Sequence, residues 1–165
     1  MIETLLHWMH DLPKEAVVMI IAALPVSELR GAIPVALAYG MSFQKAFMLS
    51  VIGNAIPVIP MLFLFKPVSN RLSKLKVFTG FFDWLTKRTL NNADSIQKYE
   101  LLGLIIFIAI PLPMTGAYSG TIAASLLKMK FRYGFIGSIL GIIGAGIIVT
   151  SLCAIGIMSW KSISL

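Results

Sequence analysis

The sequence predicts an all-α integral membrane protein, an inverted repeat of a re-entrant helical hairpin followed by a transmembrane helix, with amphipathic interfacial helices. The membrane class follows from composition, because 58% of the 165 residues are hydrophobic and only 13% are charged. Soluble domains carry about 45–50% apolar and about 25% charged residues. The arrangement follows from four long apolar runs, two of which are interrupted by prolines and glycines.

The four apolar runs are Ala16–Tyr39, Ala46–Phe65, Leu101–Leu127 and Gly134–Trp160. A bilayer crossing needs about 20 apolar residues. The second and fourth runs contain no charged residue. Each of these two runs therefore predicts one full crossing.

The first and third runs are broken near their middles by the prolines Pro25, Pro34, Pro111 and Pro113. Proline removes a backbone donor and clashes with the preceding turn, so these residues are predicted helix breakers. The predicted halves are Ala16–Leu24 with Leu29–Tyr39, and Leu101–Ala109 with Thr115–Leu127. A half of about ten residues is about 15 Å long, half the hydrocarbon thickness. Each broken run is either one kinked crossing or a re-entrant hairpin.

Charge distribution favours the hairpins. The segment Lys66–Lys98 contains seven basic and two acidic residues, and the positive-inside rule places it in the cytoplasm. A re-entrant third run returns the next basic cluster, Lys128 to Arg132, to the same side, whereas a full crossing would leave it outside. We therefore expect one membrane domain, with a first repeat at 1–65, a cytoplasmic basic segment at 66–98 and a second repeat at 99–165.

Two segments have apolar residues at helical spacing and predict interfacial helices. One is Ile2–Met9, and the other lies within Lys66–Lys98, where lysines alternate with leucines and phenylalanines. A basic amphipathic helix binds anionic lipid head groups, so lipids rather than nucleic acid are the expected partners of the +7 net charge. The alternative for the second segment is a solvated linker helix.

Short identities suggest that the halves are repeats. Arg30-Gly31-Ala32 aligns with Thr115-Gly116-Ala117, and the stretch 50–53 (SVIG) aligns with 138–141 (SILG). Inverted repeats with broken helices at matching positions are typical of transporters whose site lies near the bilayer midplane. Chance similarity among small apolar residues is the alternative.

Glu28 and Arg30 are the charged residues inside an apolar run. A charged side chain at bilayer depth costs at least about 2.5–3.5 kcal/mol, so it is retained where it faces a cavity or a partner. At the start of a half-helix, the amides, the helix dipole and the guanidinium would converge on one anionic group. Glu28 would balance Arg30 in the empty site and take up a proton when a ligand displaces it. The alternative is an internal ion pair that caps the half-helix.

Polar residues elsewhere could line an opposing wall, although helix–helix hydrogen bonding is the alternative for each. The sequence shows no catalytic constellation, so no enzyme activity is expected, nor any metal or cofactor. The candidate substrate-binding residues are Glu28, Arg30, Gly31, Asn54, Thr115, Gly116 and Tyr118, with Ser119 and Thr121 beside them.

The run Ser27-Glu28-Leu29-Arg30-Gly31-Ala32-Ile33-Pro34, the later stretch 111–120 (PLPMTGAYSG) and the chain length resemble the small multidrug export family of prokaryotic membrane proteins. That family looks like a distant relative of the DedA and VTT-domain proteins, which carry two re-entrant hairpins, each followed by a transmembrane helix. Lipid scrambling and uptake of polyprenyl-phosphate carriers occur in that superfamily. This resemblance implies functional roles for Glu28 and Arg30 in the first hairpin. The second hairpin departs from the DedA pattern because it has neither a carboxylate nor an arginine.

The leading hypothesis is a multi-pass transporter of a prokaryotic inner membrane that moves an amphipathic substrate, a lipid phosphate being one candidate, with proton coupling through Glu28. The alternative within transport is a small multidrug exporter of hydrophobic cations. The alternative from another class is a non-transporting membrane scaffold. With two full crossings per chain, a homodimer is a further expectation.

Overall fold

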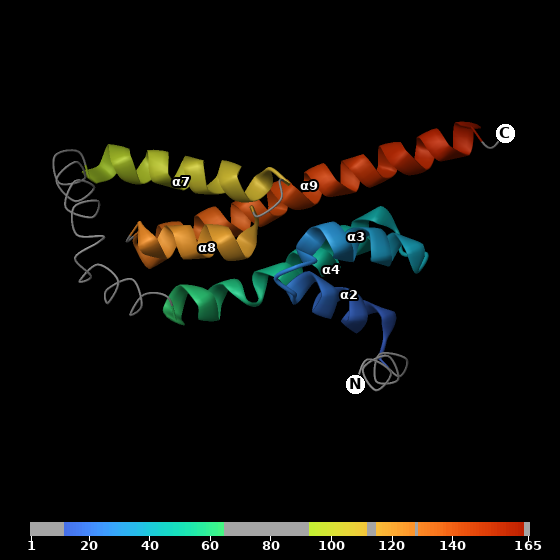
Figure 1. The fold of residues 1–165 in the computed structure, drawn as a ribbon, viewed down its shortest axis with the longest axis horizontal. Helices are drawn as coiled ribbons and strands as arrows, with labels where there is room; N and C mark the ends of the chain where they lie inside the picture. The colour runs from blue at the N-terminus through green and yellow to red at the C-terminus, as the bar shows by residue number, and fades with distance from the viewer. Residues whose placement is uncertain (1–11, 65–92, 112–114, 128, 164–165) are drawn as a thin grey trace.

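The computed structural model describes residues 12–64, 93–111, 115–127 and 129–163, and this part of the chain contains helices and no strand (Figure 1). Its helices are α2 (Lys14–Ala23), α3 (Glu28–Ala38), α4 (Phe43–Ala55), α7 (Ala93–Ala109), α8 (Ala117–Leu126) and α9 (Phe131–Ile163). The predicted interfacial helix at Ile2–Met9 lies outside the described residues. So does most of the basic segment, whose last residues form the start of α7.

Two helices are long and apolar enough to cross a membrane: Phe43–Leu64, which comprises α4 and its continuation, and Phe131–Ser159 within α9. At 1.5 Å per residue, the 22 residues of the shorter one extend about 33 Å, which matches a hydrocarbon core of about 30 Å. Large apolar side chains are exposed along both helices, among them Ile52, Phe63 and Ile147. An all-helical membrane protein with two full crossings was predicted, and the structure agrees at this level.

The remaining four helices form two pairs that approach the middle of the bundle from opposite ends (Figure 1). Within the first pair, Gly31 of α3 lies against Ile21 of α2. Within the second pair, Gly120 of α8 lies against Ile108 of α7. The end of Phe43–Leu64 and the starts of α7 and α9 lie together at one end of the molecule (Figure 1).

Each spanning helix packs against the first helix of one pair through a glycine. A Cβ on Gly53 of α4 would lie 2.5 Å from the carbonyl oxygen of Met19 in α2. A Cβ on Gly141 of α9 would lie 3.2 Å from the carbonyl oxygen of Ile105 in α7. Met19 and Ile105 each lie four residues before the last residue of their helix. The two contacts are therefore equivalent, one in each half of the chain.

One sequence-based expectation about a proline is wrong. Pro34 was predicted to break a helix but lies inside α3, where its fixed φ suits the helix. The run Ala46–Phe65 was predicted to be one crossing, and its described residues lie within the spanning helix Phe43–Leu64, although α4 ends at Ala55 and helix resumes at 58. Pro57 lacks the N–H that would continue the α-helical hydrogen bonds there.

An ion pair joins the start of α2 to the start of α4. The Lys45 ammonium donates a hydrogen bond of 2.6 Å to the Glu15 carboxylate. This bond holds the pKa of the Glu15 carboxyl below its ordinary value. Both side chains are about half exposed, so the pair contributes little to stability.

Candidate functional site

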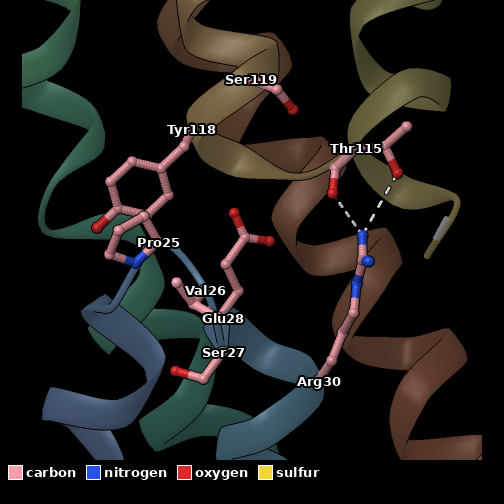
Figure 2. A pocket seen from close by; sticks show the side chains of 8 residues that line it. All are labelled: Pro25, Val26, Ser27, Glu28, Arg30, Thr115, Tyr118 and Ser119. Carbon is pink, nitrogen blue, oxygen red and sulfur yellow. Dashed lines mark hydrogen bonds between the residues drawn. The ribbon is translucent and has the colours of Figure 1, made fainter. Parts of the chain in front are cut away.

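Glu28 is the first residue of α3, and its side chain reaches across to the start of α8 in the other helix pair (Figure 2). It is 8% exposed. The backbone N–H groups of Ala117 and Tyr118 donate hydrogen bonds to its carboxylate. These N–H groups have no partner within α8, because the first turn of a helix leaves its donors unsatisfied. Glu28 therefore caps the helix of the opposite half of the chain.

Gly116, which precedes α8, makes this approach possible. A Cβ at this position would lie 2.6 Å from the Glu28 carboxyl carbon. Its φ of 154° and ψ of −171° also fall in a backbone region that is essentially restricted to glycine. The carboxylate thus contacts the bare backbone where α8 begins.

Arg30 lies two residues along the same helix, about half a turn, and its side chain extends to Thr115 in the segment that joins α7 to α8 (Figure 2). Its Nη2 donates to the carbonyl oxygen of Thr115 at 2.5 Å and to Thr115 Oγ1 at 3.3 Å. The Thr115 hydroxyl in turn donates to the carbonyl oxygen of Ile110 at 2.8 Å. The guanidinium thereby stabilises the segment that joins α7 to α8.

Two hydroxyl groups donate hydrogen bonds to carbonyl groups at the end of α2, where the chain turns toward α3. The Tyr118 hydroxyl donates a hydrogen bond to the carbonyl oxygen of Ala23, the last residue of α2. The Ser27 hydroxyl donates to the carbonyl oxygen of Ile21 at 2.6 Å. Each half of the chain thus supplies a side chain to a broken helix of the other half.

Glu28 also has an unusual backbone conformation, with a φ of +46°. A glutamate rarely adopts the left-handed region, and such a residue costs of order 1–3 kcal/mol. Strain of this kind persists where the surrounding contacts determine the conformation and is common at functional sites. Here it directs the carboxylate away from α3 and toward α8.

A cavity of about 140 Å³ lies between the segment that joins α2 to α3 and the segment that joins α7 to α8. Its lining residues are Pro25, Val26, Ser27, Glu28, Arg30, Thr115, Tyr118 and Ser119 (Figure 2). The structure therefore brings together four of the predicted binding residues, Glu28, Arg30, Thr115 and Tyr118, with Gly116 packed behind the carboxylate. Their role in binding stays a prediction.

Other predicted residues lie away from this cavity. Gly31 packs against Ser27 within its own helix pair. Asn54 is buried in α4 with 1% exposure, and the Thr121 hydroxyl donates to the carbonyl of Ala117 within α8. Pro25 lies between α2 and α3 and Pro111 lies two residues after the end of α7, whereas Pro113 lies outside the described residues.

Two lining residues were not predicted. Ser27 carries a recognisable signal, because serine before a helix is a common cap, although its hydroxyl caps the end of α2 instead. Val26 is 97% exposed at the turn, and no local sequence signal singles out such a residue. The part of the chain that the structure describes contains no cluster of His, Cys, Asp or Glu able to hold a metal ion.

These features define a helical membrane protein with a small polar site between two interrupted helix pairs. Residues 28–148 match the model of the family described as "Putative small multi-drug export protein", and the chain belongs to this family. The family is an exporter family rather than an enzyme class. No curated protein and no solved structure matches the chain significantly. The predicted relationship to DedA proteins stays a prediction.

Proposed function

We propose that the chain is a small membrane transporter that moves an amphipathic substrate with an anionic head group, such as a lipid phosphate, through a site between two re-entrant hairpins. The hairpins are α2–α3 and α7–α8. The observation that carries the proposal is the Glu28 carboxylate on the first N–H groups of α8. A helix start that binds a carboxylate of the protein itself is suited to bind an anionic group of a substrate.

The positions at which the helix pairs contact the spanning helices support a site at mid-depth in the bilayer. Gly53, which packs on the last turn of α2, is the eleventh of the 22 residues of its span. Gly144, which packs on Ala109 at the end of α7, is the fourteenth of 29. Both hairpins therefore end halfway along a spanning helix. The equivalent contacts of Gly53 and Gly141 support an inverted repeat, the arrangement in which transporters bind substrate near the midplane.

The charges of the site support an anionic ligand that competes with Glu28. The Arg30 guanidinium and the start of α8 are both positive, and Glu28 is the acidic residue among those that line the cavity. In our proposal, an incoming phosphate takes over the α8 amides and the displaced Glu28 takes up a proton. The site then keeps its net charge during transport, which couples substrate to proton movement.

The cavity size favours a head group over a complete drug molecule. Pockets for drug-sized ligands enclose about 300–1,000 Å³, whereas this cavity encloses about 140 Å³. A phosphate or a similar small group fits that volume. The apolar part of the substrate would pass the exposed Val26 toward the surrounding lipid.

Transport of a fluorescent lipid phosphate between the leaflets of proteoliposomes tests the proposal. We expect Arg30→Ala to slow transport at least about tenfold, because a hydrogen bond to a charged group is worth about 1.5–3 kcal/mol. We expect Glu28→Gln to remove the pH dependence of the rate. Arg132→Ala and Glu15→Gln, which change exposed charges far from the cavity, serve as matched controls. Wild-type rates in both Arg30→Ala and Glu28→Gln would contradict the assigned roles.

Export of hydrophobic cations is the second candidate, and the description of the family supports it. In this case Glu28 binds the cation directly. Resistance of cells to cationic dyes should then fall with Glu28→Gln and tolerate Arg30→Ala. Loss of lipid-phosphate transport in Arg30→Ala distinguishes the first candidate from the second.

The orientation and the partners are also proposals. We place 66–98 in the cytoplasm against anionic lipids of an inner membrane, and the common end shared by the starts of α7 and α9 supports this placement (Figure 1). Labelling of Lys130→Cys from outside intact cells would contradict it. A non-transporting scaffold, in contrast, predicts that cysteines at Ser27 and Thr115 are inaccessible from both sides.

A further inference from the structure

Four buried side-chain oxygen atoms on the two spanning helices have no hydrogen-bond partner in the protein. They are Ser50 Oγ and Asn54 Oδ1 of α4 and Ser138 Oγ and Thr150 Oγ1 of α9. Ser50, Asn54 and Ser138 are at most 1% exposed. Buried polar groups are almost always hydrogen-bonded, so each exception needs a physical explanation.

The hydroxyls of α8 show that these exceptions are not a general property of this chain. Thr121 donates to the carbonyl of Ala117 at 2.5 Å, and Ser125 donates to the carbonyl of Thr121 at 2.9 Å. Both bonds join a residue to the carbonyl four positions earlier, the usual partner of a hydroxyl in a helix. Ser50 and Ser138 lie in helices of the same kind but lack this bond.

The packing of the two spanning helices places the four residues at successive levels. Gly146 of α9 lies against Val51 of α4, and Gly134 lies against Leu62. The helices are therefore antiparallel, with Asn54 close to the level of Ile142. Along the axis of α9, the four residues follow one another in the order Thr150, Ser50, Asn54 and Ser138. Neighbouring residues in this order are about one helical turn apart, so the four together extend roughly 18 Å along the axis.

Two of the four residues also occupy matching positions in the two halves of the chain. Ser50 is the eighth residue of α4 and Ser138 is the eighth residue of α9. Both side chains have 0% exposure, and both hydroxyls lack a protein partner. If the missing hydrogen bond of one hydroxyl were accidental, it would not be expected to recur at the matching position of the other half.

We propose that Ser50, Asn54, Ser138 and Thr150 form a hydrated track along which the polar head group of the substrate passes. This inference rests on the proposed transport function and extends it from the cavity to the path. Water and the head group supply the hydrogen bonds that the protein does not. Thr150 also lines a groove between α4 and α9 with Phe47 and Met48, which gives the track an opening beside the lipid.

Thiol labelling tests whether water reaches the track. In a Cys153→Ser background, we expect Ser50→Cys, Asn54→Cys and Ser138→Cys to react with a charged, membrane-impermeant reagent. The controls Ala46→Cys and Val58→Cys replace apolar side chains that are equally buried, at 0% and 1%. We expect reaction at least tenfold faster in the track than in the controls. Equal rates in the two sets, whether slow or fast, would overturn the proposal.

Transport and thermal unfolding give a second test. We expect Ser138→Ala to slow transport at least tenfold and to keep the unfolding midpoint within about 2 °C of the wild type, because its hydroxyl is bonded to water rather than to the protein. Ser125→Ala, which removes a hydroxyl bonded to the protein, should lower the midpoint slightly and keep the transport rate. A wild-type transport rate in Ser138→Ala, or a midpoint lowered further than in Ser125→Ala, would overturn the proposal. If the wild type moves no lipid phosphate, the transport proposal fails, and labelling and unfolding still test the track.

Discussion

Replacing Gly116 by alanine is expected to destabilise the protein by about 3 kcal/mol or more and to abolish transport. The φ of 154° suits only glycine, and forcing another residue into that region costs about 1–3 kcal/mol. The new methyl group would also displace the Glu28 carboxylate from the start of α8, at a cost of about 1.5–3 kcal/mol for its charge-assisted hydrogen bonds. Thermal unfolding in detergent and transport in liposomes measure the two effects.

Gly103→Ala is the matched control for this substitution. Gly103 lies within α7, and a Cβ there would meet nothing within 4 Å. Alanine is favoured over glycine in a helix by about 1 kcal/mol, so this variant should unfold at the same or a higher temperature. If Gly116→Ala proves as stable and active as Gly103→Ala, the contact between Glu28 and α8 does not hold the site together.

Replacing Gly53 by alanine is expected to have the second-largest effect, a loss of about 1–3 kcal/mol from overpacking. The added Cβ would lie 2.5 Å from the Met19 carbonyl oxygen and 2.8 Å from its Cα. These are backbone atoms, so α2 can relieve the contact only by moving away from α4. That movement would also shift the break that carries Glu28.

Gly141→Ala should produce a similar but smaller loss, because its Cβ would meet the Ile105 carbonyl oxygen at 3.2 Å and the side chain of Ile108 at 2.6 Å. Unfolding midpoints of Gly53→Ala, Gly141→Ala and Gly156→Ala give the comparison, since a Cβ at Gly156 meets nothing within 4 Å. Equal midpoints in all three variants would show that the spanning helices do not pack closely on the half-helices.

Most helices could be predicted from the sequence because apolar runs and breakers are local signals. The predicted halves agree with α2, α3, α7 and α8 to within two residues, except where α7 begins at Ala93 instead of Leu101. Pro34 and Pro57 show the limit of this reasoning. Whether a proline interrupts a helix depends on the surrounding packing, which a single sequence does not contain.

The candidate site could be predicted in part. Glu28 and Arg30 stand out because charge is rare in an apolar run, and their grouping with Thr115 and Tyr118 follows from the matched breaks. The alignment of Arg30 with Thr115 is not the structural one, because α3 begins at Glu28 and α8 at Ala117. The capping of each broken helix by the other half depends on tertiary geometry, so the sequence predicted neither Glu28 on α8 nor Tyr118 on Ala23.

The depth of the first hairpin in the bilayer tests the central proposal most directly. Val26 is 97% exposed at the tip of α2–α3, so a spin label at Val26→Cys should leave the fold intact. Relaxation by oxygen and by a water-soluble nickel complex measures its depth. In the re-entrant arrangement, the label at position 26 should lie as deep as a label at Ile147, which is near the middle of the α9 span. That depth is about 15 Å below the surface. A depth equal to that of Leu64, at the end of its span, would contradict a midplane site between two hairpins.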